Sequence, residues 1–274
     1  MILPFESMIL LIVLGFLVGI VASMVGIGGG VFIVPFLTLI FDFTPHKAVG
    51  TSLAVIVFTS IASTIAYSRQ KRIDYKIGLL LVASTIPGAM TGAYLTTLIQ
   101  GRVLGIIFAL FLLFVAFKMT FNLNIIQISV PSWRFGCWRR RLIDSDGKVF
   151  EYGANILLGS FLGFFGGASS GLLGIGGGAL IVPILHFIVG VPIHITVATS
   201  MFIMIFTSIS GVIQHITYGN VSFGYAMFMA LGVIFGAQIG AHIAKKVGGK
   251  LLRRIFAIVL IIMSVRLLLK FMPP

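Results

Sequence analysis

Acidic residues are scarce in this chain of 274 residues, which has 6 aspartates and glutamates against 19 lysines and arginines. Charged residues of all kinds make up 9% of the chain, against roughly 25% in ordinary soluble domains. Because 59% of the residues are hydrophobic, a soluble fold of this size would leave a large apolar surface in water. The composition excludes a soluble enzyme and a disordered chain, and it indicates a polytopic membrane protein.

The few groups that could do chemistry are poorly placed for it. A single cysteine, Cys137, excludes an intrachain disulfide. No acid lies deep in an apolar run, and Asp42 comes nearest, so a carboxylate proton relay or cation site is not expected. The 5 histidines lack metal-ligand spacing, and no Ser-His-Asp or paired-acid set is visible. We therefore predict no catalytic residues, no metal and no cofactor, and hence no enzyme.

The net charge of +13 would suggest a nucleic-acid partner in a soluble protein. Here the basic residues lie in short loops between apolar runs, which is typical of topology signals in membrane proteins. We therefore predict no nucleic-acid partner. Attraction of anionic solutes or lipid headgroups is a second interpretation of the same charges.

Ten apolar runs account for most of the chain, and they lack the alternation of barrel strands, so we expect helices. They lie at about 8–25, 30–41, 47–67, 77–98, 103–121, 154–173, 178–190, 195–217, 223–244 and 251–270. The second run of each half is short. It could be a full crossing or half of a re-entrant pair.

The second half of the chain repeats the first at an offset of 148 residues. Residues 26–37 read GIGGGVFIVPFL and residues 174–185 read GIGGGALIVPIL, with nine of twelve positions identical. The same offset, without a gap, relates His46 to His194, Thr51-Ser52 to Thr199-Ser200, Thr59-Ser60 to Thr207-Ser208, and Gly92-Ala93 to Gly240-Ala241. We infer a duplicated five-segment unit, because chance would not hold one register over about 95 residues.

Equivalent loops of the two repeats carry opposite charge bias. The loop 69–76 carries four basic residues and its counterpart 217–224 carries none. In the other pair of equivalent loops, the loop 245–254 carries five basic residues, whereas its counterpart in the first repeat carries only Arg102. Two repeats of opposite topology should show this pattern under the positive-inside rule, and an odd number of crossings per repeat produces it.

We predict an all-α integral membrane protein of the plasma membrane with two inverted-topology repeats of about five hydrophobic segments each and glycine-broken helices. The repeats span 1–121 and 153–274, and a basic linker spans 122–152. In this scheme the linker is cytoplasmic and both termini lie outside. The linker holds Trp133 and Trp138 beside its arginines. It is either an interfacial segment that contacts lipid headgroups or a regulatory, partner-binding element.

Two glycine clusters are the strongest candidates for a binding site. They comprise Gly26, Gly28, Gly29 and Gly30, and Gly174, Gly176, Gly177 and Gly178. Four glycines within five positions should break a helix, because each costs roughly 1 kcal/mol in a helix interior. Free N–H groups at the start of the next segment would then seat an anion. The alternative is close helix packing, which we also expect for the scattered glycines.

Further candidates surround these clusters. Pro35 and Pro183 each follow a cluster by five residues and should permit a kink or a gate. The pairs Thr51-Ser52 and Thr199-Ser200 could bind an oxyanion without a buried charge, or form hydrogen bonds between helices. Gln238 is a polar residue within an apolar run and is therefore a candidate ligand.

The two GIGGG-x-x-IVP blocks, the Thr-Ser pairs and the Gly-Ala-x-x-Gly-Ala segment resemble the TauE/SafE family of sulfite and organosulfonate exporters. The resemblance covers nearly the whole chain. It implies a plasma-membrane permease of bacteria or archaea that moves small sulfur-containing anions such as sulfite or sulfoacetate. The linker with two tryptophans is less typical of the family.

We therefore expect a transporter, and the resemblance implies that it exports its solute. Its site would lie at the interface of the repeats, and alternating access would rock one repeat against the other. A passive anion channel and a non-transporting membrane scaffold or assembly subunit are the alternatives. Its expected partners are a small anionic solute and membrane lipids. The sequence leaves a homo-oligomer open.

Overall fold

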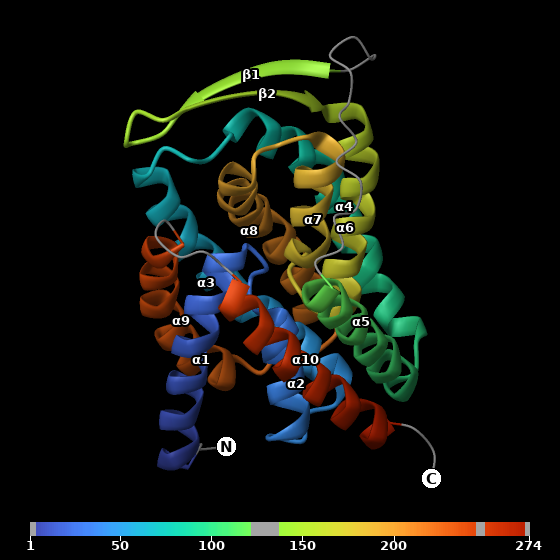
Figure 1. Ribbon diagram of the computed structural model, residues 1–274. Helices are drawn as coiled ribbons and strands as arrows, with labels where there is room; N and C mark the ends of the chain where they lie inside the picture. Colours follow the sequence, from blue (N-terminus) through green and yellow to red (C-terminus); the bar gives the residue numbers. More distant parts are fainter. Residues whose placement is uncertain (1–3, 122–136, 245–249, 272–274) are drawn as a thin grey trace.

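The computed structural model describes residues 4–121, 137–244 and 250–271, which form a helical bundle with one β-hairpin (Figure 1). The first repeat comprises α1 (Phe5–Val25), α2 (Gly30–Leu39), α3 (Pro45–Arg69), α4 (Tyr75–Leu98) and α5 (Gly101–Phe121). The hairpin comprises β1 (Cys137–Ile143) and β2 (Val149–Asn155). The second repeat comprises α6 (Ile156–Leu173), α7 (Gly178–Pro183) with the π-helix η1 (Ile184–Val189), α8 (Ile193–Thr217), α9 (Phe223–Ile243) and α10 (Lys250–Phe271).

Helices in the two halves of the chain correspond in length and position. Helices α3 and α8 both have 25 residues, and their ends are related by the offset of 148. Six of the described helices are long and apolar enough to cross a membrane, which confirms an all-α membrane protein. Helix α2 has 10 residues, about 15 Å of helix against a hydrocarbon core of about 30 Å. It is therefore too short to cross alone.

The two repeats do not form separate bundles. Helix α1 packs on α9, and its equivalent α6 packs on α4, while α5 packs on α10 and α3 on α8. Glycines permit the closest of these approaches, since a methyl group added at Gly19 would lie 2.8 Å from the Val233 carbonyl oxygen. The packing role that we expect for scattered glycines is confirmed for Gly15, Gly19, Gly88, Gly92, Gly236 and Gly240.

The hairpin forms from the second half of the basic linker, and nothing in the charge pattern had predicted it. Its strands pair antiparallel, with Cys137 opposite Asn155 and Ile143 opposite Val149. The Asn155 side chain then accepts a hydrogen bond from the N–H of Leu158 at 3.2 Å and caps α6, so β2 leads directly into the second repeat. Residues 122–136, including Trp133, lie outside the described residues.

The hairpin and the chain ends mark opposite ends of the bundle (Figure 1). The hairpin lies over the turn between α3 and α4, where the Ser145 N–H donates to the Gln70 carbonyl at 3.0 Å. Both termini are at the other end. The basic loop 69–76 and the described part of the linker thus share one end of the molecule. The basic side chains of 245–254 lie outside the described residues.

Candidate functional site: two glycine turns at the centre of the bundle

Both glycine clusters break their helices, as the sequence predicts. Helix α1 ends at Val25, and the residues from Gly26 to Gly29 form a turn, the first glycine turn, before α2 begins. The second glycine turn runs from Gly174 to Gly177 between α6 and α7. Positive φ values of 80°, 81° and 95° occur at Gly26, Gly28 and Gly29, and the equivalent glycines of the second turn have positive values of 68°, 73° and 81°. Such angles cost other residues roughly 1–2 kcal/mol each, so both turns require glycine.

The two glycine turns touch each other. A methyl group added at Gly178 would lie 2.5 Å from the Gly26 carbonyl oxygen. At the equivalent Gly30 it would overlap the Gly174 carbonyl oxygen. The start of α2 therefore lies against the end of α6, and the start of α7 lies against the end of α1. All of these glycines are buried.

The Thr-Ser pairs lie beside the glycine turns and cross between repeats. The Ser52 hydroxyl donates to the Gly174 carbonyl at 2.6 Å, and Ser200 donates to the Gly26 carbonyl at 3.1 Å. Each serine therefore ties a helix of one repeat to the glycine turn of the other. This is the helix-to-helix bonding that was the alternative for these pairs, and it occupies the serine protons.

The two threonines have a different role. Thr51 Oγ1 accepts the N–H of Ser222, and Thr199 Oγ1 accepts the N–H of Asp74, both at 3.0 Å. Most other hydroxyls in the bundle donate to a carbonyl three or four residues earlier, as Thr38 does to Val34. Within the described residues, the hydroxyl protons of Thr51 and Thr199 have no acceptor. Both are therefore available to a bound solute.

More hydrogen-bond donors without acceptors gather at the turns. Over the described parts of the chain, the N–H groups of 28–30 and 176–178 donate to no carbonyl or side chain. The Ser170 hydroxyl is also buried without a partner, and its Cβ lies 3.4 Å from a methyl group added at Gly177. Sequence reasoning missed Ser170, because its repeat equivalent is Ala22 and no repeated signal marks it. Buried donors of this kind normally have a partner, so the turns favour an acceptor-rich ligand.

Two apolar side chains close the space between the turns. Ile56 and Met204 occupy equivalent positions on α3 and α8, and both are fully buried. A methyl group added at Gly176 would meet Ile56 Cγ2 at 2.8 Å and Met204 Cε at 2.9 Å. Ile56 and Met204 therefore fill the space between the two glycine turns.

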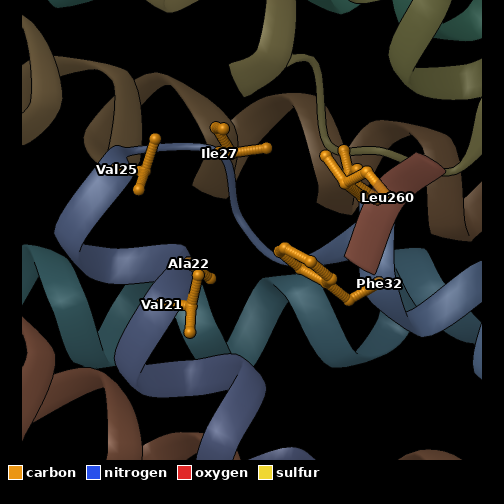
Figure 2. Close-up of a pocket in the computed structure, with 7 residues that line it drawn as sticks. Val21, Ala22, Val25, Ile27, Phe32 and Leu260 are labelled. Atoms are coloured by element: carbon orange, nitrogen blue, oxygen red, sulfur yellow. The ribbon is translucent and has the colours of Figure 1, made fainter. Parts of the chain in front are cut away.

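A small apolar pocket lies beside the first glycine turn. It is lined by Val21, Ala22, Val25, Ile27, Val31, Phe32 and Leu260 (Figure 2). These side chains come from α1, the turn, α2 and α10. They offer no polar atom, so the pocket does not suit an anion.

The remaining candidates from the sequence, Pro35, Pro183 and Gln238, lie in different parts of the structure. Pro35 is buried within α2. After Pro183, the chain continues as the π-helix η1, and the apolar helix extends over 178–189. Gln238 lies on the exposed face of α9, and its backbone carbonyl accepts a hydrogen bond from His242 Nδ1 at 2.9 Å. The structure does not place Gln238 beside the turns.

A charged cluster outside the membrane-spanning segments reaches Thr199 through Asp74. Burial acts to raise the pKa of the Asp74 carboxyl, but hydrogen bonds from Arg140 and Tyr152 outweigh it. The pKa therefore lies below the ordinary value of 3.8, and the carboxylate is charged. Burial and the bond to Asp74 together raise the pKa of Tyr152. No motif in the sequence predicts this cluster.

Comparison with known proteins identifies the family of this chain. Residues 11–267 match the model of the family described as sulfite exporter TauE/SafE. The chain is 36% identical over 269 residues to a Bacillus subtilis protein named "Probable membrane transporter protein YunE", covering 96% of this chain and 97% of that protein. A "Probable membrane transporter protein" of Methanocaldococcus jannaschii is 33% identical over 285 residues, covering 97% and 98%. No solved structure matches. The chain therefore belongs to the TauE/SafE sulfite exporter family, and it is a multi-pass membrane transporter.

Proposed function

We propose that this transporter exports small sulfur-containing anions, such as sulfite or sulfoacetate, across the plasma membrane. The anion would bind between the two glycine turns. The observation that carries the proposal is the set of buried donors without acceptors, namely the N–H groups of 28–30 and 176–178. The hydroxyls of Thr51, Thr199 and Ser170 add three further donors. Such a site binds an oxyanion through hydrogen bonds and needs no buried counter-charge.

Alternating access requires two bodies that move about the site. The packing favours bodies that mix the repeats, because α1 and α9 hold together, as do α4 and α6. Helices α3 and α8 pack on each other as closely as α3 packs on α9 and α8 on α4, so they form a central pair between two outer bodies, α1 with α9 and α4 with α6. The outer bodies meet along α3 and α8, beside the glycine turns. Motion between these bodies replaces the simpler picture of one repeat rocking on the other.

The orientation proposed from the loop charges is that the hairpin end faces the cytoplasm and both termini face outside. The basic loop 69–76 at the hairpin end supports this, since basic loops remain on the cytoplasmic side. The inverted relation of the repeats is supported by the exchange of partners, with α1 on α9 and α6 on α4.

Flux into liposomes that contain the purified protein tests the proposal. We expect saturable flux of sulfite or sulfoacetate with counter-flow, and little flux of acetate. Linear flux without counter-flow would instead indicate a passive channel. No flux of any small sulfonate, sulfite or thiosulfate would leave a scaffold or assembly subunit as the better description.

Variants then locate the site. Ser170→Ala and Thr51→Val remove hydroxyls at the turns and should lower the apparent affinity for the anion about tenfold each, since a hydrogen bond to a charged group is worth about 1.5–3 kcal/mol. Thr97→Val is the matched control, because Thr97 is exposed and its hydroxyl donates to the Tyr94 carbonyl. Glycine-to-alanine changes are less informative here, because positive φ values destabilise any such variant. Unchanged affinity in both site variants would move the anion site elsewhere.

A further inference from the structure

The two repeats contain equivalent joints between a helix start and a threonine. In one, the N–H of Asp74, the residue before α4, donates to Thr199 of α8 at 3.0 Å. In the other, the N–H of Ser222, the residue before α9, donates to Thr51 of α3 at 3.0 Å. The two joints lie on opposite sides of the glycine turns, since Thr199 is bonded to Asp74 beneath the hairpin and Thr51 is bonded to the start of α9 at the other end of the bundle (Figure 1).

The joint at Asp74 is clamped by the hairpin. Arg140 donates through Nε to Asp74 Oδ2 and through Nη2 to Oδ1, both at 2.9 Å. The Tyr152 hydroxyl donates to Oδ2 at 2.6 Å. Oδ1 also caps α4 by accepting the N–H groups of Lys76 and Ile77 at 3.1 and 3.2 Å. The Asp74 side chain is fully buried, so these five donors hold a charge that water does not reach.

A second buried ion pair fixes the tip of the hairpin to the same loop. Arg72 Nη2 lies 3.1 Å from Asp144 Oδ2, and the Asp144 side chain is only 1% exposed. The Ser145 N–H donates to the Gln70 carbonyl at 3.0 Å. The hairpin therefore cannot move away from the loop 70–74 without breaking both ion pairs.

The equivalent joint in the other repeat has no clamp. Ser222 is half-buried, and its side chain makes no capping hydrogen bond to α9. Among the residues that the structure describes, no ion pair involves Ser222 or Thr51. Water can therefore replace the bond at Ser222 when the joint opens. The hairpin, in contrast, is held to Asp74 by an ion pair, and its Phe150 shares a buried apolar cluster with Ile195 at the start of α8. Thr199 therefore cannot leave Asp74 without disturbing one of these two contacts.

We propose that the β1–β2 hairpin is a latch that keeps the hairpin end of the transporter closed, with Asp74 as the positioning residue that fixes Thr199. The latch consists of the ion pairs Asp74–Arg140 and Arg72–Asp144 together with Tyr152. Because charge-assisted hydrogen bonds are about twice as strong as neutral ones, the two ends open with unequal ease. The protein at rest then favours opening at the end that holds the termini, and reaching the hairpin-open state requires release of the latch.

Two single-cysteine variants, each made in a chain with Cys137→Ser, report the opening of the two ends separately. Val197 and Val49 are equivalent and buried, and each lies against a glycine turn, with their Cα atoms 3.1 and 2.7 Å from methyl groups added at Gly26 and Gly174. Val197→Cys reports the hairpin end and Val49→Cys the other end. The reaction rate with a membrane-impermeant maleimide, offered from both sides of vesicles, measures how often each end opens. No transported substrate is needed, so the test is independent of the proposed function.

Arg140→Gln should raise the labelling rate at position 197 about tenfold, the change expected for loss of a charge-assisted hydrogen bond, and leave position 49 unchanged. Arg141→Gln is the matched control, because it makes the same charge change in the same strand. Arg141 pairs only loosely with Glu151, at 3.5 Å, and both side chains are about two-thirds exposed. Equal rates in the two variants at position 197, or equal increases at both reporters, would overturn the latch.

A milder variant covers the case in which Arg140→Gln does not fold. Tyr152→Phe removes one hydroxyl and keeps the ring that packs at the edge of the core. It should raise labelling at position 197 by a smaller factor, again without an effect at position 49. If Tyr152→Phe folds and labels like the unmodified reporter protein, the hairpin is only a structural support and the proposal fails.

Discussion

Replacing Thr199 by valine deletes one hydroxyl with little change of volume and leaves the N–H of Asp74 without an acceptor. That N–H is buried, because Asp74 is 1% exposed, so water cannot compensate. A buried donor left unpaired costs about 1–3 kcal/mol. Thr51→Val breaks the equivalent bond to the half-buried Ser222, whose N–H water can reach, and should cost about 0.5–1 kcal/mol.

Thermal unfolding in detergent measures this difference. For a chain of this size, 1 kcal/mol corresponds to a shift in Tm of roughly 2–4 °C. We expect Thr199→Val to lower Tm by about 5 °C and Thr51→Val by about 2 °C or less. Combining Thr199→Val with Arg140→Gln should cost less than the sum of the two single changes, because both loosen one hydrogen-bond network. Equal losses for the two threonine variants would refute the assignment of a stronger joint at the hairpin end.

Three further predictions concern packing, pH and topology. Gly92→Ala places a methyl group on the facing α6 backbone and should cost about 1–3 kcal/mol in thermal unfolding, whereas exposed Met90→Ala on the same helix should cost little. The two carboxyls of the latch, Asp74 and Asp144, have pKa values below the ordinary value of 3.8. They therefore stabilise the hairpin fully at a pH above 3.8, and this stabilisation is lost as the pH falls below that value. The fluorescence emission of Trp138, measured in a variant without Trp133, should therefore stay constant from pH 8 to about 5 and change below about 4. A change near pH 6 would contradict the assignment of this effect to the two carboxyls. Cysteines at the exposed Lys71 and Thr217 should label only from inside and only from outside the cell, respectively, and external labelling at 71 would overturn the proposed orientation.

Much of the fold could be predicted because it depends on local composition and on the duplication. Apolar length gives the helices, and the offset of 148 relates their ends. The glycine breaks follow from residue type, since only glycine takes the positive φ values at Gly28 and Gly176 without strain. The two breaks lie in duplicated units, and the approach of Gly178 to the Gly26 carbonyl brings them together.

What the sequence did not predict depends on contacts between distant residues. Asp74 looked like an ordinary loop acid, because its partners Arg140 and Tyr152 are 66 and 78 residues away. The exchange of helix partners depends on which glycine faces which backbone, and hydropathy does not encode that. Gln238 lies on the outward face of α9, which its polarity alone did not indicate.

The exchanged helix partners also determine when the protein can complete its fold during synthesis. Helix α1 ends at residue 25 and its partner α9 begins at residue 223, so about 200 residues separate them. At roughly 5–20 residues per second, the glycine-lined face of α1 waits about 10–40 s in the membrane before it is covered. Helices α4 and α6 are about 60 residues apart and meet several-fold sooner. The half of the bundle that carries the hairpin therefore assembles first, and a chain truncated before α9 keeps an unpaired glycine face in the bilayer.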